Sequence, residues 1–161
     1  MDERIVIDTR EQKPLWQSNT ISHKLDAGDY SIEGHEDKFA IERKSAMDLY
    51  GTLGNGNKRF KLELERAQKL KYFAIVIEAP YYKIFGKKFP SAFRSKMKGP
   101  VVTSILFTLH VKYGINIFFS TTRTESKQII KELMKAYLKQ EANNDKLNKV
   151  KEVETKCVPT Q

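Results

Sequence analysis

The sequence predicts a single mixed α/β domain, and its length, composition and periodicity all support this. Short apolar runs alternate with amphipathic helical patterns, which is the order expected of a central sheet flanked by helices. A chain of 161 residues suits one domain with one sizeable core. We expect this domain over residues 1–139. From residue 140 the chain turns to Glu, Asn, Asp and Lys, so we expect a frayed or disordered tail over residues 140–161.

Five strands are predicted from apolar runs and turn residues. Residues 4–8 form a short run that ends at Asp8. Residues 30–33 and 38–44 flank a turn-forming segment and are typical of an antiparallel hairpin. Residues 72–78 and 115–119 are apolar almost throughout, which suits strands in a sheet covered on both faces.

Three helices are predicted from apolar spacing and from their end residues. The first spans residues 59–70, with Phe60 and Leu64 on one face. The second begins at Pro100, a residue favoured in a first turn, and ends at Gly114. The last follows a capping box formed by Thr122 and Glu125.

The charge balance indicates a polyanionic partner. The chain has 29 Lys and Arg against 20 Asp and Glu, a formal net charge of +9. Such a surplus is most typical of nucleic-acid binding, although an anionic membrane surface or simple solubility also explain it. No apolar run is long enough to span a bilayer, and acidic residues stand where a signal peptide carries positive charge. The single cysteine, Cys157, excludes an intrachain disulfide, so we expect an intracellular protein.

The first third of the chain carries the residues with catalytic chemistry. Glu42 and Lys44 are two apart on a predicted strand, so their side chains share one face. Asp29 opens the partner strand and Asp8 ends a neighbouring one. Carboxylates that hold Mg²⁺ or Mn²⁺ beside a lysine have the parts for phosphodiester hydrolysis. The competing interpretation is a weak surface ion pair on a hairpin, because Glu-x-Lys alone is a common pattern.

A longer pattern in this region resembles the nuclease domain of the XPF and Hef structure-specific endonucleases. That family is marked by Gly-Asp followed by Glu-Arg-Lys-x-x-x-Asp, and the resemblance covers residues 4–138. The matching residues here are Gly28-Asp29 and Glu42-Arg43-Lys44-Ser45-Ala46-Met47-Asp48, with further likeness at Asp8-Thr9-Arg10-Glu11, Arg59-Phe60 and Ile75-Val76-Ile77-Glu78.

The resemblance implies a restriction-endonuclease-like fold of the PD-(D/E)XK type and a metal-dependent DNA endonuclease that cuts flaps, forks or junctions. The implied catalytic residues are Asp29, Glu42 and Lys44, with Arg43 near the scissile phosphate and Asp48 organising the site from the following helix. Asp8, Asp29 and Glu42 would hold Mg²⁺ or Mn²⁺, and Glu11 would be a supporting acidic residue. The alternative is a non-catalytic DNA-binding or partner subunit, as some members of the family have become.

Basic residues near these motifs are candidates for DNA contact. Lys58, Arg59 and Lys61 lie at the start of a predicted helix, where phosphate binding would offset their conflict with the helix dipole. Arg10 is a further candidate. Residues 81–98 interleave aromatic and basic residues, which fits either a second DNA-binding element or a loop whose Phe85, Phe89 and Phe93 pack on the core.

The remaining expectations concern partners and cofactors. The chain is too short for the helix-hairpin-helix module or the helicase common in the family, so it resembles a free-standing nuclease domain. Similar domains form homodimers through their last helices, which makes Ile129, Leu133 and Tyr137 either interface or core residues. We expect no nucleotide cofactor, because residues 51–57 lack the Gly-Lys-Ser/Thr of a P-loop. The dispersed His23, His35 and His110 indicate no zinc site.

Overall fold

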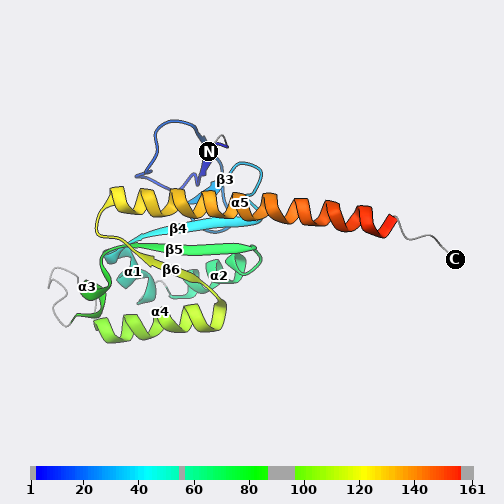
Figure 1. Cartoon of the computed structure of the whole chain (residues 1–161). Coiled ribbons are helices and arrows are strands. Elements are labelled where there is room, and N and C mark those ends of the chain that lie inside the picture. The colour runs from blue at the N-terminus through cyan, green and yellow to red at the C-terminus, as the bar shows by residue number, and fades with distance from the viewer. Residues whose placement is uncertain (1–2, 55–56, 87–96, 157–161) are drawn as a thin grey trace. The chain divides into compact units, whose positions relative to one another are not determined.

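A computed structural model describes residues 3–54, 57–86 and 97–156. It has the mixed α/β architecture that the sequence predicts, a central sheet flanked by helices (Figure 1). In chain order the elements are β1 (Ile5–Ile7), β2 (Thr20–Ser22), β3 (Tyr30–Ile32), β4 (Phe39–Ser45), α1 (Ala46–Leu53), α2 (Asn57–Ala67), β5 (Tyr72–Glu78), α3 (Tyr81–Phe85), α4 (Gly99–Tyr113), β6 (Asn116–Phe119) and α5 (Arg123–Lys156).

The sheet has six strands in the order β2-β1-β3-β4-β5-β6. β3 pairs antiparallel with both β1 and β4, whereas β4, β5 and β6 run parallel to one another. The five predicted strands are therefore confirmed, and so is the hairpin of residues 30–44. The prediction missed β2, because Thr20-Ile21-Ser22 is short and mostly polar. It is a partly exposed edge strand that pairs parallel with β1.

β4 and β5 form the centre of the sheet, and their register decides which side chains share a face. Ala40 lies beside Phe73, and Lys44 lies beside Ile77. Because side chains alternate along a strand, every second residue of β4 points to the same face. One face therefore receives Ala40, Glu42 and Lys44, and the other receives Ile41 and Arg43.

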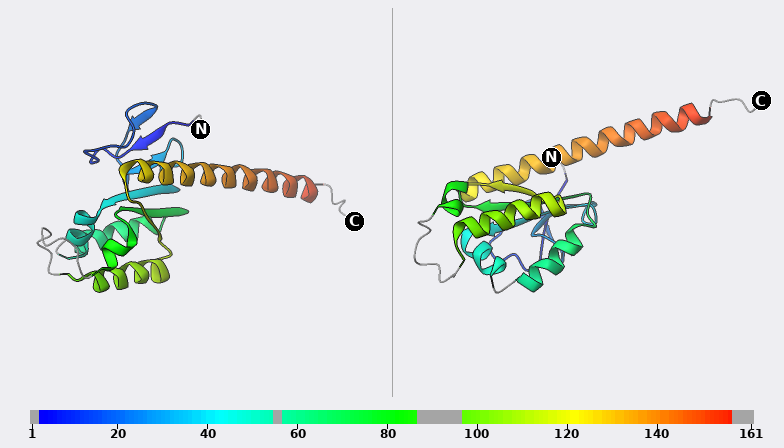
Figure 2. Two further views of the ribbon diagram at one scale, coloured as in Figure 1. Left: turned by 60° about the vertical axis from the view of Figure 1, so that its left-hand side comes forward. Right: turned by 90° about the horizontal axis from the view of Figure 1, so that it is seen from below.

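Helices α1, α2 and α4 cover one face of the sheet, as Figures 1 and 2 show. This is the face of Glu42 and Lys44, because Lys44 contacts the Phe60 ring of α2. The main hydrophobic core lies in this layer. Its buried members are Ala27, Ala40, Leu49, Tyr50, Leu53, Phe60, Leu64, Ala67, Phe73, Ile75, Ile77, Ala79, Ile84, Val102, Leu106, Leu109 and Ile115. The two predicted helices of this layer, α2 and α4, are confirmed.

The opposite face is covered by the loop that follows β1 and by the first turns of α5. The Arg123 side chain donates to the Lys13 carbonyl oxygen at 2.9 Å. Lys127 lies 5.3 Å from the centroid of the Trp16 ring. Half of the predicted capping box is present, since Thr122 Oγ1 accepts from the Glu125 amide at 3.1 Å. The Glu125 carboxylate accepts from the Thr121 amide at 2.6 Å, one residue before the N-cap.

Short helices account for two of the differences from the sequence prediction. α1 begins directly at the end of β4, and the periodic pattern of residues 46–53 is too short to stand out. α3 occupies the start of the aromatic and basic segment of residues 81–98, where its Phe85 is 51% exposed rather than packed in the core. Residues 87–96, which include Phe89 and Phe93, lie outside the described residues.

The chain divides into two compact units, Met1–Ile130 and Lys131–Gln161. In the second unit α5 continues to Lys156, although a frayed or disordered tail was predicted from residue 140. Residues 140–156 contain no Gly or Pro and are rich in Glu and Lys, which favour helix. A domain boundary at residue 139 stays a prediction. Among the described residues, none of the helices combines the length and apolar character needed to cross a bilayer.

Candidate active site

The β3–β4 hairpin brings Asp29, Glu42 and Lys44 to one face of the sheet. Tyr30 of β3 lies opposite Ile41 of β4, and the register extended by one residue sets Asp29 opposite Glu42. Lys44 is two residues further along β4 and therefore shares the face of Glu42. The structure thus brings together the three residues expected to form the catalytic core, and their catalytic role stays a prediction.

Gly28 allows β3 to begin close against β4. Its φ is +79°, in the left-handed region that glycine adopts without strain, and a Cβ here would lie 3.0 Å from the Ile41 carbonyl oxygen. The next residue, Asp29, donates its amide to that oxygen at 2.9 Å. Glycine before Asp29 is therefore required by the close approach of the two strands.

Lys44 is a buried cation held between a carboxylate and an aromatic ring. Its Nζ lies 2.5 Å from Glu42 Oε1, and both residues are less than 10% exposed. The same Nζ lies 5.6 Å from the centroid of the Phe60 ring on α2. Burial lowers the pKa of Lys44, and the adjacent Glu42 raises it. The effect of Glu42 is the larger one in sum, so the pKa lies above its usual value and the lysine stays charged.

Asp29 and Glu42 form a buried acidic pair in which each carboxyl holds its proton more tightly than usual. Burial raises the pKa of Asp29 to about 7. Burial, followed by repulsion from Asp29, raises the pKa of Glu42 to about 8. Asp29 Oδ2 is fixed by the Arg43 backbone amide at 2.8 Å. Buried carboxylates whose ionisation is disfavoured in this way are suited to receive a cation.

Asp8, a predicted metal ligand, is engaged by Arg10 in this structure. Arg10 donates its Nε to Asp8 Oδ1 at 2.6 Å and its Nη2 to Oδ2 at 3.0 Å. The backbone amides of Arg10 and Leu25 donate to the same carboxylate at 2.8 and 2.7 Å. Although burial acts in the opposite direction, these hydrogen bonds lower the Asp8 pKa. Asp8 is thus held by protein donors, and its metal-binding role stays a prediction.

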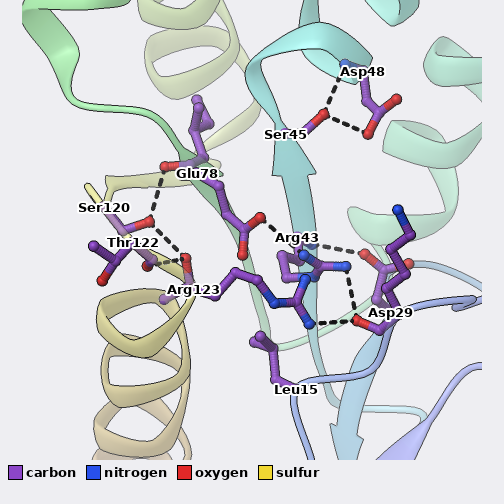
Figure 3. Close-up of polar contacts among 12 residues, drawn as sticks. Leu15, Asp29, Arg43, Ser45, Asp48, Glu78, Ser120, Thr122 and Arg123 are labelled. Atoms are coloured by element: carbon purple, nitrogen blue, oxygen red, sulfur yellow. Dashed lines mark hydrogen bonds and ion pairs between the residues drawn. The ribbon is translucent and has the colours of Figure 1, made fainter.

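Asp48 organises the junction between β4 and α1. Ser45 Oγ caps α1 by accepting from the Asp48 amide at 3.1 Å, and it donates to Asp48 Oδ2 at 2.6 Å (Figure 3). This reciprocal bonding fixes the N-cap at Ser45, directly after Lys44, and the helix starts at Ala46. Asp48 therefore makes a helix-capping contact, and its role in the site stays a prediction.

Arg43 and Glu11 lie on the face of the sheet opposite to Glu42 and Lys44. Arg43 Nη2 is 3.1 Å from Glu11 Oε2, and its Nη1 is 3.0 Å from Glu78 Oε2. Figure 3 shows the Arg43 side chain between Glu78 and the chain near Leu15. The Arg43 and Glu11 side chains thus lie across the sheet from Glu42 and Lys44, although the Glu11 carboxylate is close enough to Asp29 to raise the pKa of Asp29. The site roles of Arg43 and Glu11 stay predictions.

Helix α2 presents its residues to the site and to solvent. Lys58, Arg59 and Lys61, the predicted DNA-contacting residues, are exposed, and Arg10 is partly exposed. Glu63 was not predicted as a site residue. It stands one turn after Phe60. Burial is the main reason for the raised pKa values of Asp29 and Glu42, and the negative charge of Glu63 raises both pKa values a little more. The i, i+3 spacing of Phe60 and Glu63 could have indicated from the sequence that the two residues lie on the same side of the helix.

A model of the ERCC4 domain matches residues 7–133. The chain belongs to the ERCC4-domain family. This is an XPF-like family of DNA structure-specific nucleases. Two solved structures of XPF from Aeropyrum pernix, one in complex with DNA, are similar to this chain with 22% sequence identity and a TM-score of 0.64 each. The matches cover 83% and 86% of this chain but only 61% and 66% of those chains. No curated protein sequence matches the chain.

The solved structures confirm the restriction-endonuclease-like fold that the resemblance implied. A metal ion in this ERCC4 domain would need several side-chain donor atoms close to one another. Within the described residues, no three acidic, His or Cys side chains are arranged as a complete metal site. Asp29 and Glu42 nevertheless supply hard oxygen donors that can exchange a proton for a cation, and such donors fit Mg²⁺ or Mn²⁺.

Proposed function

We propose that this ERCC4-domain protein is a divalent-metal-dependent DNA endonuclease. The observation that carries the proposal is the buried pair of Asp29 and Glu42 on one face of the sheet with Lys44 beside them. Two carboxylates and one lysine at this spacing match the parts needed to hydrolyse a phosphodiester bond. The membership of the chain in a nuclease family supports the same assignment.

Each central residue has a separate task in this proposal. Asp29 and Glu42 would hold Mg²⁺ or Mn²⁺, which when bound polarises the phosphate and lowers the pKa of a water molecule. Lys44 lies within hydrogen-bond distance of Glu42, so its ammonium is positioned to orient a water or to stabilise charge that develops on the phosphate. Phe60 limits the directions in which that ammonium can move.

The proposed substrate is DNA, with flaps, forks or junctions as the preferred structures. The net charge of +9 and the exposed Lys58, Arg59 and Lys61 support binding to a polyanion. One of the similar solved structures is a complex of XPF with DNA. The matches cover less than two thirds of the length of those XPF chains. A preference of this protein for branched DNA is therefore part of the proposal.

One observation favours a second candidate, a non-catalytic DNA-binding or partner subunit. Asp8 is saturated by Arg10 and Leu25, and the described residues hold no complete group of three metal-binding side chains. A protein that binds DNA without cutting it would be compatible with this arrangement. The retention of Asp29, Glu42 and Lys44 in one buried cluster supports the catalytic proposal over this one.

A cleavage assay separates the two candidates. Purified protein is incubated with labelled single-stranded, duplex, flap, fork and four-way DNA in Mg²⁺, Mn²⁺ or EDTA. We expect cutting in either metal, none in EDTA, and none by Glu42→Gln protein, which keeps the side-chain shape. Binding without cutting under every condition would establish the non-catalytic subunit, and full cutting in EDTA would reject the metal mechanism.

We propose that the protein also forms a homodimer. Ile129, Leu133 and Tyr137, the residues of the last helix expected at an interface, are all half-buried in the single chain. More exposed apolar area lies on α4, where Phe107 is 58% and Val111 is 83% exposed at i, i+4 spacing. A second copy would remove this surface from water. Light scattering should give twice the mass of one chain, and Val111→Asp should give the single-chain mass.

A further inference from the structure

The Arg43 guanidinium joins two carboxylates that come from distant parts of the chain. It contacts Glu11, which follows β1, at 3.1 and 3.2 Å, and it contacts Glu78 at the end of β5 at 3.0 Å. The side chains are 10%, 7% and 14% exposed. Glu78 Oε1 is buried and has no hydrogen-bond partner among the described residues. Arg43 is therefore an important counter-charge for both carboxylates.

The same guanidinium fixes the loop over residues 11–16. Arg43 Nη2 donates to the Lys13 carbonyl oxygen at 3.1 Å, and the Lys13 amide donates to Glu11 at 2.6 Å. The Leu15 amide donates to the Tyr30 hydroxyl at 3.1 Å. The Trp16 ring packs edge-on against Tyr30 with centroids 5.4 Å apart. The loop is thus attached to the face of the sheet where Arg43 lies (Figure 3).

The other end of this loop reaches the candidate active site. The Glu11 amide donates to the Asp8 carbonyl oxygen at 3.0 Å. Between these two residues stands Arg10, whose guanidinium holds both oxygens of Asp8 and the Leu25 carbonyl oxygen. A displacement of Glu11 would therefore move Arg10 and disturb Asp8, whose backbone amide donates to the Asp29 carbonyl oxygen at 2.9 Å.

We propose that Arg43 is a positioning residue that acts from the opposite face of the sheet. It holds Glu11 and Lys13 in place, and through them it fixes Arg10 and Asp8 beside the Asp29–Glu42 pair. A direct phosphate contact would require the guanidinium to leave two buried carboxylates without their counter-charge, which is strongly unfavourable. The functional half of this inference rests on the proposed nuclease activity, whereas the structural half concerns the free protein alone.

Amide hydrogen exchange and cleavage together test the proposal. Lysine keeps the charge of Arg43 but cannot reach Glu11, Glu78 and Lys13 with separate nitrogen atoms. We expect Arg43→Lys to raise exchange at Lys13 and Leu15 by about tenfold or more. Cleavage should fall by about 100-fold. Mn²⁺ affinity, measured by calorimetry, should stay within about twofold of wild type, because Asp29 and Glu42 are unchanged.

The matched control is Arg4→Lys, which alters an exposed pair with Glu33 and should leave exchange and cleavage unchanged. Lost cleavage with unchanged exchange in Arg43→Lys would overturn the proposal and place Arg43 on the substrate. Raised exchange with full cleavage would overturn it as well, because the loop of residues 11–16 would then have no part in positioning the residues needed for cleavage.

Glu11→Gln keeps the test decisive if Arg43→Lys does not fold. Glu11→Gln weakens the contact between Arg43 and residue 11 and leaves the Arg43–Glu78 pair intact. Raised exchange at Leu15 together with reduced cleavage would support the proposal, and no change in either would overturn it. A wild-type protein that cuts no DNA would reject the proposed function, and the exchange measurement would still decide whether Arg43 fixes the loop.

Discussion

Asp29 and Lys44 act on the Glu42 carboxylate in opposite directions. After burial, Asp29 raises the pKa of Glu42 and Lys44 lowers it. We expect Asp29→Asn to leave the free energy of unfolding of metal-free protein unchanged or higher at neutral pH, because one repelling charge is removed. Lys44→Ala should lower it by about 1–3 kcal/mol, because Glu42 stays buried without its ion-pair partner. Urea denaturation without metal measures both changes.

The control for this comparison is the exposed pair of Arg4 and Glu33. Glu33→Gln should denature at the same urea concentration as wild type, since exposed pairs contribute little. If Lys44→Ala matched this control, the buried pair would not stabilise the fold. If Asp29→Asn were strongly destabilising, its hydrogen bond from the Arg43 amide would outweigh the repulsion.

The raised pKa values of Asp29 and Glu42 make metal affinity depend on pH. Each carboxyl keeps its proton in the folded protein at pH values where the unfolded chain has released it. The pair therefore stabilises the metal-free fold most below about pH 4, and this contribution is lost as pH rises through about 7 and about 8. A metal ion competes with these protons, so Mn²⁺ affinity should rise over the same range.

Calorimetric titration of Mn²⁺ in buffers with different ionisation heats checks this prediction, because it counts the protons released on binding. Asp29→Asn should bind Mn²⁺ more weakly and with a smaller dependence on pH. An affinity that is constant between about pH 5 and about pH 8 would show that neither carboxyl exchanges its proton for the metal.

Among the elements, α2 illustrates how far the sequence could predict the site. The period of Phe60 and Leu64 predicted the helix and its buried side. The spacing of Glu42 and Lys44 on a strand predicted that the two side chains share a face. Neither pattern showed which residues of α2 would lie over that strand, because the packing of a helix on a sheet depends on the whole core. Glu63 was missed for this reason.

The position of Glu63 on α2 gives a prediction with a built-in control. Glu63 is half-buried one turn after Phe60, whereas Glu65 is exposed on the same helix. We expect Glu63→Gln to weaken Mn²⁺ affinity by about threefold to tenfold, because it removes a negative charge that acts on Asp29 and Glu42. Glu65→Gln should bind as wild type does. Equal affinities in calorimetric titrations of the two variants would exclude Glu63 from the site.

Other differences from the sequence prediction have local causes. β2 was missed because Ser22 and Thr20 are polar, and its pairing with β1 is formed across a long loop. The four hydrogen bonds to the Asp8 carboxylate include one from Leu25, far along the chain, which no local pattern reveals. By contrast, Pro100 and Gly114 mark the ends of α4 correctly, since Gly114 adopts a φ of 65° there.

At the scale of the whole molecule, the net charge of +9 predicts DNA binding that weakens steeply with salt. Lys58, Arg59 and Lys61 are exposed together on α2. Replacing all three by Ala should flatten the plot of log affinity against log salt by about 0.9 for each phosphate that is no longer neutralised. Fluorescence anisotropy with a labelled fork, in Ca²⁺, gives the slope. Replacing Lys131, Lys135 and Lys139 of α5 removes the same charge and serves as the control.

If the α2 variant kept the wild-type slope, these three residues would bind no phosphate, and DNA would bind elsewhere. If both variants flattened the slope equally, net charge alone would account for the effect. Only a larger change in the α2 variant supports a phosphate-binding surface next to the Asp29–Glu42 pair.

The alternation along β4 has a consequence for how this protein can change in length. Glu42 and Lys44 point toward α2, and Arg43 points toward the loop of residues 11–16. Deleting one residue between the Gly34 turn and Glu42 would exchange these directions for every following residue of the strand. Glu42 and Lys44 would then point toward Glu11 and Glu78, and Arg43 would point toward Phe60. Only the deletion of an even number of residues keeps each side chain of β4 on its own face of the sheet. This segment should therefore accept two-residue deletions more readily than single ones.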